Sequence, residues 1–183
     1  KFLKNELKNK KFKFINDNIN KIQNINKYFK NVSTIFHLAA LADVKNSFRD
    51  RKIHIENNIL ATQNIIEAAI SNKVKNIIFA STASVYGNTK NIPTNEDNSF
   101  PIQNSFYAAA KLSSEALLTS VAEANNIKVS IIRLVSVLGP RYTHGHINDF
   151  YKKLKNNKNR LKVLGNGLQK KSYIHVYDVI NAF

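Results

Sequence analysis

The sequence predicts an α/β fold in which helices cover a doubly wound parallel sheet. Short apolar runs of strand length recur at wide intervals, and stretches that favour helix lie between them, as parallel strands with crossover helices require. Each run also leads into small or hydroxyl-bearing residues, which is typical of the ligand-binding edge of such a sheet. The runs are Thr34–Ala40, Asn76–Ala80 and Val129–Leu134.

The segment before the first run predicts one more strand and one helix. Lys11–Ile15 alternates polar and apolar residues, which is the pattern of a strand with one buried face. The next apolar side chains recur at helical spacing, so we expect them to lie on one helix face against the core. They are Ile22, Ile25, Tyr28 and Phe29.

Longer helices are predicted between and after the strands. Residues 105–125 favour helix because Ala, Leu, Lys and Glu dominate and no Gly or Pro interrupts the run. Residues 147–157 predict a helix, Arg160–Leu164 a strand, and another helix opens at Val176. Residues 45–72 predict a long helix whose apolar side consists of Ile55, Ile59, Ile65, Ile66 and Ala69.

Composition and charge exclude several function classes. The chain has 183 residues and no cysteine, so it can bury one core and has no disulfide or thiolate chemistry. The net charge of +16 suits an anionic partner, but the lysines are spread widely and no nucleic-acid-binding motif occurs. No stretch approaches the ~20 apolar residues of a membrane span. We therefore expect no nucleic-acid or membrane partner, and a cytoplasmic location.

Tyr107 and Lys111 are the first candidate for chemistry. They stand four residues apart in the predicted helix 105–125, so they share one helix face. An ammonium beside a phenol favours the phenolate, which predicts a lowered pKa for Tyr107 and an acid/base role near neutral pH. The alternative is a packed tyrosine next to a solvated lysine.

Five motifs follow one another along the chain: Phe36–Ala40, Ser81–Gly87, Tyr107-x-x-x-Lys111, Arg133–Arg141 and Gly165–Asp178. In this order and spacing they resemble the extended short-chain dehydrogenase/reductases, above all the NAD-dependent nucleotide-sugar epimerase/dehydratase branch, of UDP-glucose 4-epimerase type. The resemblance covers roughly residues 11–183. It implies a Rossmann-like sheet, NAD as cofactor, a nucleotide-sugar as substrate, and a homodimer formed through helices 45–72 and 105–125.

The resemblance also gives roles to residues at matching positions. Catalysis would depend on Tyr107, Lys111 and Thr82. The cofactor would contact Leu38, Ala39, Ala40, Asn58, Ala80, Ser81, Tyr107, Lys111 and Leu134, with its adenine held by Asp17 or by Asn18-Ile19. The substrate would contact Thr82, Tyr107, Ser136 and Lys171. Lys171 departs from the Arg that is usual in the family, and Ser136 from a frequent Asn.

The glycines indicate how much of this fold the chain contains. A dinucleotide fold needs a Gly-rich turn at a helix N-terminus to hold the pyrophosphate. The chain has five glycines, and none precedes Gly87. We therefore expect truncation at both ends. Residues 1–140 would be a partial NAD-binding domain without its first strands and Gly-rich turn. Residues 141–183 would be the start of a small substrate-binding portion and the return to the first domain.

The residues after Thr82 favour one reaction. Dehydratases and decarboxylases of the resembled family carry an acidic residue there, whereas this chain has Ala83-Ser84, which cannot serve as carboxylate acid or base. The resemblance thus favours epimerisation at C4 through a transient 4-keto sugar, of UDP-glucose/UDP-galactose type. A 4-reductase, a dehydratase, or an inactive fragment acting as a binding module stays open.

Two further groups have an alternative to a role in chemistry. Glu96-Asp97 could be catalytic carboxylates, but a solvated loop is the expected reading. His144-x-His146 could be metal ligands, but no third ligand stands at useful spacing, so we expect a substrate loop and no metal.

Overall fold

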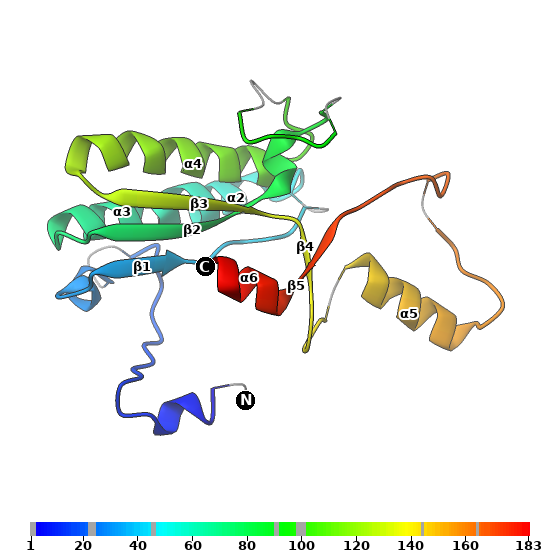
Figure 1. Cartoon of the computed structure of the whole chain (residues 1–183), viewed down its shortest axis with the longest axis horizontal. Coiled ribbons are helices and arrows are strands. Elements are labelled where there is room, and N and C mark those ends of the chain that lie inside the picture. The colour runs from blue at the N-terminus through cyan, green and yellow to red at the C-terminus, as the bar shows by residue number, and fades with distance from the viewer. Residues whose placement is uncertain are drawn as a thin grey trace.

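A three-stranded parallel sheet lies at the centre of the chain (Figure 1). This computed structural model describes residues 3–21, 25–44, 47–89, 92–97, 102–143, 145–163 and 165–183. The strands stand in the order β1-β2-β3, and both neighbouring pairs are parallel. Their bounds are Thr34–His37 for β1, Asn76–Thr82 for β2 and Lys128–Leu134 for β3. The predicted parallel sheet is confirmed, although β1 stops before Leu38.

Two helical units cover one face of the sheet (Figure 1). The first runs from α2 (Arg51–His54) through the π-helical turn η3 (Ile55–Leu60) into α3 (Ala61–Ser71). The second is α4 (Phe106–Asn125). The helix predicted over 45–72 thus begins at Arg51, because residues 47–49 form a turn and residues 45–46 lie outside the described part.

The ends of α4 explain where Tyr107 is placed. The hydroxyl oxygen of Ser105 accepts a hydrogen bond of 3.1 Å from the backbone N–H of Ala108, so Ser105 caps the first turn. Asn126 ends the helix in the left-handed conformation, with φ of 51°. This start puts Tyr107 in the first turn of α4 and Lys111 one turn later, both at the edge where β2 ends.

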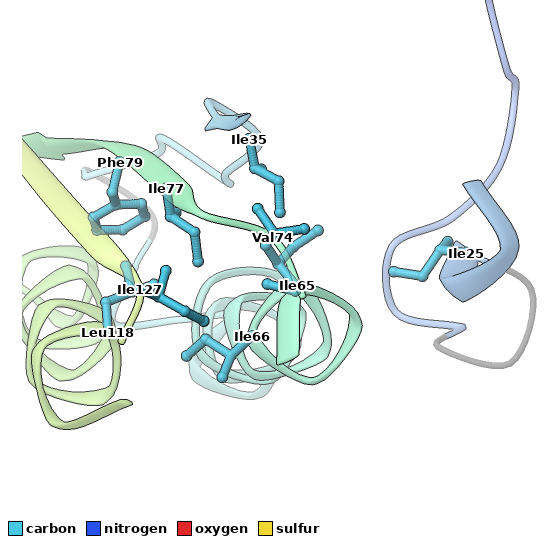
Figure 2. Packing of buried hydrophobic residues seen from close by; sticks show 10 residues of the cluster. Ile25, Ile35, Ile65, Ile66, Val74, Ile77, Phe79, Leu118 and Ile127 are labelled. Carbon is cyan, nitrogen blue, oxygen red and sulfur yellow. The ribbon is translucent and has the colours of Figure 1, made fainter. Parts of the chain in front are cut away.

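The core lies between the sheet and these helices. Every second residue of β2 is buried, which is why Ile77 and Phe79 both point toward the helical layer. Figure 2 shows side chains of β2, α3 and α4 meeting in this layer. The buried cluster is Ile25, Ile35, Ile65, Ile66, Ala69, Val74, Ile77, Phe79, Leu118 and Ile127. It confirms that Ile25, Ile65, Ile66 and Ala69 are core residues.

The opposite face of the sheet is more open. Phe36 of β1 is 54% exposed, and its ring contacts that of Phe183, whose centroid lies 6.4 Å away. Phe183 directly follows α6 (Val176–Ala182), so the end of α6 lies against this face. The helix that was expected to open at Val176 is confirmed.

A second, smaller sheet extends from the main body (Figure 1). It pairs β4 (Ser136–Leu138) with β5 (Tyr173–His175) in parallel, and Ser136 stands opposite Tyr173. The chain between them carries α5 (His146–Asn156), close to the predicted 147–157. Among the helices of the described residues, none is both long and apolar enough to cross a bilayer.

Three local predictions fail. Lys11–Ile15 and the described part of Arg160–Leu164 belong to no strand. A strand exists only through a hydrogen-bonded neighbour, and neither segment has one among the described residues. The helix expected around Ile22 to Phe29 is only the short 3₁₀ turn η2 (Asn26–Phe29), with residues 22–24 outside the described part. The polar start contributes the 3₁₀ turn η1 (Glu6–Lys8).

Candidate functional site

Tyr107 and Thr82 meet where β2 ends. Tyr107 lies in the first turn of α4 and is only 9% exposed, while Thr82 is the last residue of β2. The Thr82 hydroxyl lies near enough to the Tyr107 hydroxyl to influence its pKa. The parallel strands bring their carboxyl ends to this same edge, so the pair lies where α/β sheets bind ligands. A phenol paired with a threonine hydroxyl can donate or accept a proton at one oxygen of a substrate.

A short turn after β2 holds Thr82 in place. The Thr82 hydroxyl oxygen accepts a hydrogen bond of 3.2 Å from the backbone N–H of Ser84 and donates one of 3.2 Å to the Ser84 hydroxyl. It thereby caps the 3₁₀ turn η4 (Ala83–Tyr86). This capping depends on the Thr82 side chain having one orientation, which is also the orientation that reaches Tyr107.

Lys111 is buried one helical turn after Tyr107. Its side chain is 2% exposed, and its Nζ lies 3.8 Å from the centroid of the Phe79 ring. Burial lowers the pKa of Lys111 to about 8, while the nearby Glu115 carboxylate acts in the opposite direction. The alternative of a solvated lysine beside a packed tyrosine is therefore wrong for Lys111.

The expected lowering of the Tyr107 pKa is also wrong. Burial raises the pKa of Tyr107 above its usual value, and the hydrogen bond with Thr82 offsets this only in part. Loss of hydration disfavours the phenolate, and the Lys111 ammonium lies against the Phe79 ring. The described residues hold Tyr107 as a neutral phenol, which is a proton donor.

His37 begins a buried polar chain below the site. Its Nε2 lies 3.0 Å from the Thr62 hydroxyl, which donates a hydrogen bond of 2.6 Å to the backbone carbonyl of Asn58. The Ser114 hydroxyl donates a second hydrogen bond, of 3.0 Å, to that carbonyl. Burial, with a smaller effect of Lys111, lowers the pKa of His37 to about 4. His37 is therefore neutral, and its Nε2–H donates to the Thr62 hydroxyl oxygen, which ties β1 to α3.

The Asn58 side chain fixes the loop after β1. Its Oδ1 accepts a hydrogen bond of 2.8 Å from the backbone N–H of Leu41, and its Nδ2 donates to the carbonyl of Leu41 at 3.2 Å. The same Nδ2 lies 3.2 Å from Nδ1 of His54, whose ring stands edge-on to Tyr107 with centroids 6.2 Å apart. Asn58 therefore shapes the edge of the sheet through the backbone that follows β1.

A cleft opens beside this loop. It has a volume of about 700 Å³ and is lined by the backbone and side chains of residues 16–19 and 39–41 together with Asn57. It includes Asp17, Asn18 and Ile19, which the sequence singled out for the adenine, and Ala39 and Ala40. Small alanines beside an acidic and an amide side chain suit a flat heterocycle with polar edges. Leu38, expected to contact the cofactor, is 61% exposed next to the cleft.

The remaining predicted residues lie around these two groups. Ala80 and Leu134 are half-buried at the ends of β2 and β3, and Ser81 is buried. Ser136 lies at the start of β4, opposite Tyr173 of β5. The exposed Lys171 stands two residues before Tyr173. The pairing of β4 with β5 thus brings the chain segments of Ser136 and Lys171 to one end of the small sheet.

Sequence reasoning missed a buried ion pair next to the site. Glu115 of α4 is 4% exposed and accepts hydrogen bonds from Arg133 and from the Ser81 hydroxyl. The signal was present, because Glu115 stands four residues after Lys111 on the same helix face, where an unpaired acid would be costly. His37 and His54 were missed as well, since a lone histidine gives no pattern.

The loop residues that the sequence offered as alternative carboxylates or metal ligands are not arranged for chemistry in the described part of the chain. Glu96 and Asp97 are exposed, and His144 lies outside the described residues. His146 is hydrogen-bonded to the hydroxyl of Tyr173. In the described part of the chain, no cluster of three His, Asp or Glu side chains could hold a metal ion.

Residues 2–183 match the NAD dependent epimerase/dehydratase family. A dTDP-D-glucose 4,6-dehydratase of Dictyostelium discoideum is 32% identical over 191 residues, covering 97% of this chain and 44% of that protein. A UDP-glucuronate 4-epimerase of Thermodesulfobacterium geofontis is 30% identical over 179 residues, covering 96% and 55%. The chain therefore spans about half the length of these curated relatives.

Solved structures of nucleotide-sugar epimerases superpose closely on this chain. A UDP-glucuronic acid 4-epimerase from Bacillus cereus, crystallised with UDP-glucuronic acid and NAD, superposes with a TM-score of 0.87 at 29% identity. The match covers 97% of this chain and 56% of that one. The Rossmann-like fold expected from the sequence is confirmed. With its parallel sheet, its Tyr107–Thr82–Lys111 arrangement and a family match along almost its whole length, the chain belongs to the NAD-dependent epimerase/dehydratase family of extended short-chain dehydrogenase/reductases.

Proposed function

We propose that the protein containing this chain is an NAD-dependent epimerase that inverts C4 of a nucleotide-sugar through a transient 4-keto sugar. The observation that carries the proposal is the interaction of Tyr107 with Thr82, one helical turn before the buried Lys111. These groups form one proton-handling site at the carboxyl edge of the sheet. The chain spans about half the length of its relatives, so the activity is proposed for the whole protein.

Tyr107 would move the proton of the reacting 4-hydroxyl. Thr82 would donate a hydrogen bond to the same oxygen once its hydroxyl proton turns from Ser84 toward the substrate. The buried Lys111 would stabilise negative charge on the phenol oxygen as the proton is transferred. Because burial raises the pKa of Tyr107, the phenol of the free protein starts protonated. It would have to lose that proton before it accepts the one from the 4-hydroxyl, and it would then return it to the 4-keto oxygen.

The described residues include candidates for both ends of NAD. Tyr107 and Lys111 would hold the nicotinamide ribose, and the cleft with Asp17, Ala39 and Ala40 would hold the adenosine. When bound, NAD supplies the acceptor and donor of the C4 hydride. No glycine precedes Gly87, so none of these 183 residues offers the Gly-rich turn that binds a pyrophosphate.

Epimerisation is favoured over dehydration by what surrounds Thr82. Removing water from C5 and C6 of a hexose needs a second acid/base pair, which carboxylates usually supply. The turn after Thr82 carries Ala83 and Ser84, and the Ser84 hydroxyl is hydrogen-bonded to Thr82. The dehydratase of Dictyostelium discoideum at 32% identity nevertheless makes dehydration the second candidate.

Product analysis separates these reactions. The whole protein would be incubated with NAD and with UDP-glucose or UDP-glucuronic acid, and the sugar products followed by NMR in D₂O. We expect the C4 epimer, with hydrogen retained at C4 and no deuterium at C5. A 4-keto-6-deoxy sugar with deuterium at C5 would identify a dehydratase instead, and a folded protein without turnover would identify a binding module.

A further inference from the structure

Glu115 links three elements of the site at one point. It lies on α4 one turn after Lys111 and two turns after Tyr107. Its carboxylate accepts a hydrogen bond from the hydroxyl of Ser81, the β2 residue next to Thr82. Arg133 of β3 donates to the same carboxylate, from Nε at 3.2 Å to each oxygen and from its terminal nitrogen at 2.8 Å. A single buried carboxylate thus joins the ends of β2 and β3 to the helix of Tyr107.

The register of β2 and β3 determines which side chains meet at Glu115. Ser81 and Arg133 are direct neighbours across the β2–β3 pairing. Their side chains therefore project side by side from the same face of the sheet, and both bind the Glu115 carboxylate. A two-point attachment of this kind fixes both the height and the rotation of α4 over the strand ends. A shift of α4 would separate Tyr107 from Thr82.

Arg133 extends the junction to the loops over the site. A terminal nitrogen donates a hydrogen bond of 3.0 Å to the backbone carbonyl of Glu96, and the guanidinium lies 4.9 Å from the centre of the Tyr86 ring. Tyr86 ends the turn η4 that begins after Thr82. One guanidinium therefore contacts both segments that follow the end of β2.

We infer that Glu115 and Arg133 form a positioning pair, which holds α4 against the ends of β2 and β3 and controls the charge that reaches Lys111. The inference deepens the proposed function, because it rests on the proposed roles of Tyr107 and Lys111. The pair does not contact a reacting atom in this arrangement. It acts through Lys111 and through the Ser81–Thr82 strand end.

The charges around Lys111 set the direction of the effect. The Glu115 carboxylate raises the pKa of Lys111 against the lowering by burial. Among the described residues, the other buried titratable groups are His37 on β1, His54 on α2 and Tyr107 on α4, and the half-buried Arg133 of β3 is paired with Glu115. Removal of the Glu115 charge leaves Lys111 with the cationic Arg133 alone, whereas removal of the Arg133 charge leaves it with an unpaired carboxylate.

The test is the titration of Lys111 itself in the whole protein. Lysine labelled with ¹³C at Cε would be followed by NMR between pH 6 and pH 11, and the Lys111 resonance assigned by its loss in Lys111→Arg. In the unchanged protein we expect a midpoint near 8. Glu115→Gln should lower this midpoint and Arg133→Gln should raise it. Glu123→Gln is the matched control, because Glu123 is exposed further along α4.

Opposite shifts in the two variants, with none in the control, would establish the pair, since general destabilisation cannot move one lysine in both directions. If Glu115→Gln fails to fold, the upward shift in Arg133→Gln decides. An unchanged midpoint, shifts of the same sign, or loss of the fold in both variants would overturn the inference and leave a merely structural ion pair. The readout needs no turnover, so it stays separate from failure of the proposed epimerase activity.

Discussion

The ammonium of Lys111 lies 3.8 Å from the centre of the Phe79 ring, in a position where the lysine is 2% exposed. The quadrupole of the ring attracts the cation, but this gain is smaller than the loss of hydration. The pKa of Lys111 accordingly falls to about 8. The residue to which the proposed function gives a chemical task is thus kept in a costly environment inside the core.

This cost predicts how stability depends on pH. Between the folded pKa of about 8 and the reference of 10.5, the unfolded chain binds a proton that the folded chain does not. Stability from this group therefore rises with pH across that window, and the penalty is fully present below it. Lys111→Met should raise the free energy of unfolding at pH 7 by up to about 3 kcal/mol. Urea unfolding at pH 7 and pH 10 measures this, and a destabilised variant at pH 7 would contradict it.

His37 predicts an acid limit. Its pKa is about 4 in the folded chain and 6.5 in the reference, so the unfolded chain binds more protons between these values. Stability from this group is present above 6.5 and lost as the pH falls toward 4, by about 3 kcal/mol. His37→Phe should flatten this dependence because it removes the titrating group. The hydrogen bond from Thr62 to the Asn58 carbonyl does not depend on His37 and stays in place. Thermal unfolding between pH 4 and pH 7 checks this against His175→Gln, an exposed histidine. Parallel curves for His37→Phe and the unchanged protein would refute it.

Much of the fold can be predicted from local sequence, because a short apolar run bounded by small residues can form few structures other than a buried strand. β2 and α4 were located within two residues of their observed ends. The segments that failed, Lys11–Ile15 and Arg160–Leu164, depend on a strand partner that local pattern does not reveal.

The sequence predicts those features of the candidate site that depend on the spacing of residues along the chain. It does not predict those that depend on burial. Tyr107 and Lys111 share a helix face by spacing alone, but the sign of the Tyr107 pKa shift comes from lost hydration, which sequence does not display. Glu115 has no role predicted from the sequence. Its partners Ser81 and Arg133 come from two strands, so only the sheet register reveals the junction.

Lys171 is predicted to bind substrate phosphate rather than to act in chemistry. The residue is exposed and stands two positions before β5. Lys171→Ala should raise the KM for the nucleotide-sugar about tenfold, which corresponds to one charged hydrogen bond, and leave kcat nearly unchanged. Lys171→Arg should keep or lower the KM because a guanidinium can bind phosphate in bidentate fashion. Steady-state kinetics tests both against Lys75→Ala at the other end of the sheet. A fall in kcat alone would contradict this role.

The homodimer implied by the resemblance can be tested on the outer side of the helical layer. Ile55 is an apolar residue that is 38% exposed on the unit running from α2 to α3. If two copies pack these helices together, Ile55→Lys would bury a positive charge from each copy in the interface. These uncompensated like charges should convert the dimer to monomer. Light scattering after size-exclusion chromatography measures the mass. Ile92→Lys, at a loop residue that is 89% exposed, should leave it unchanged. A monomeric unchanged protein would rule out the dimer.

The central claim is that Tyr107 moves the proton at the sugar C4 oxygen, and Tyr107→Phe in the whole protein tests it most directly. The substitution removes one hydroxyl that Thr82 contacts and leaves the ring against His54. We predict that kcat for C4 epimerisation falls on the order of 10²–10⁴-fold, while the Kd for NAD stays within a few fold. Tyr151→Phe, at a tyrosine that is 65% exposed on α5, is the matched control and should retain full turnover. Turnover by Tyr107→Phe at the rate of the unchanged protein would contradict the account.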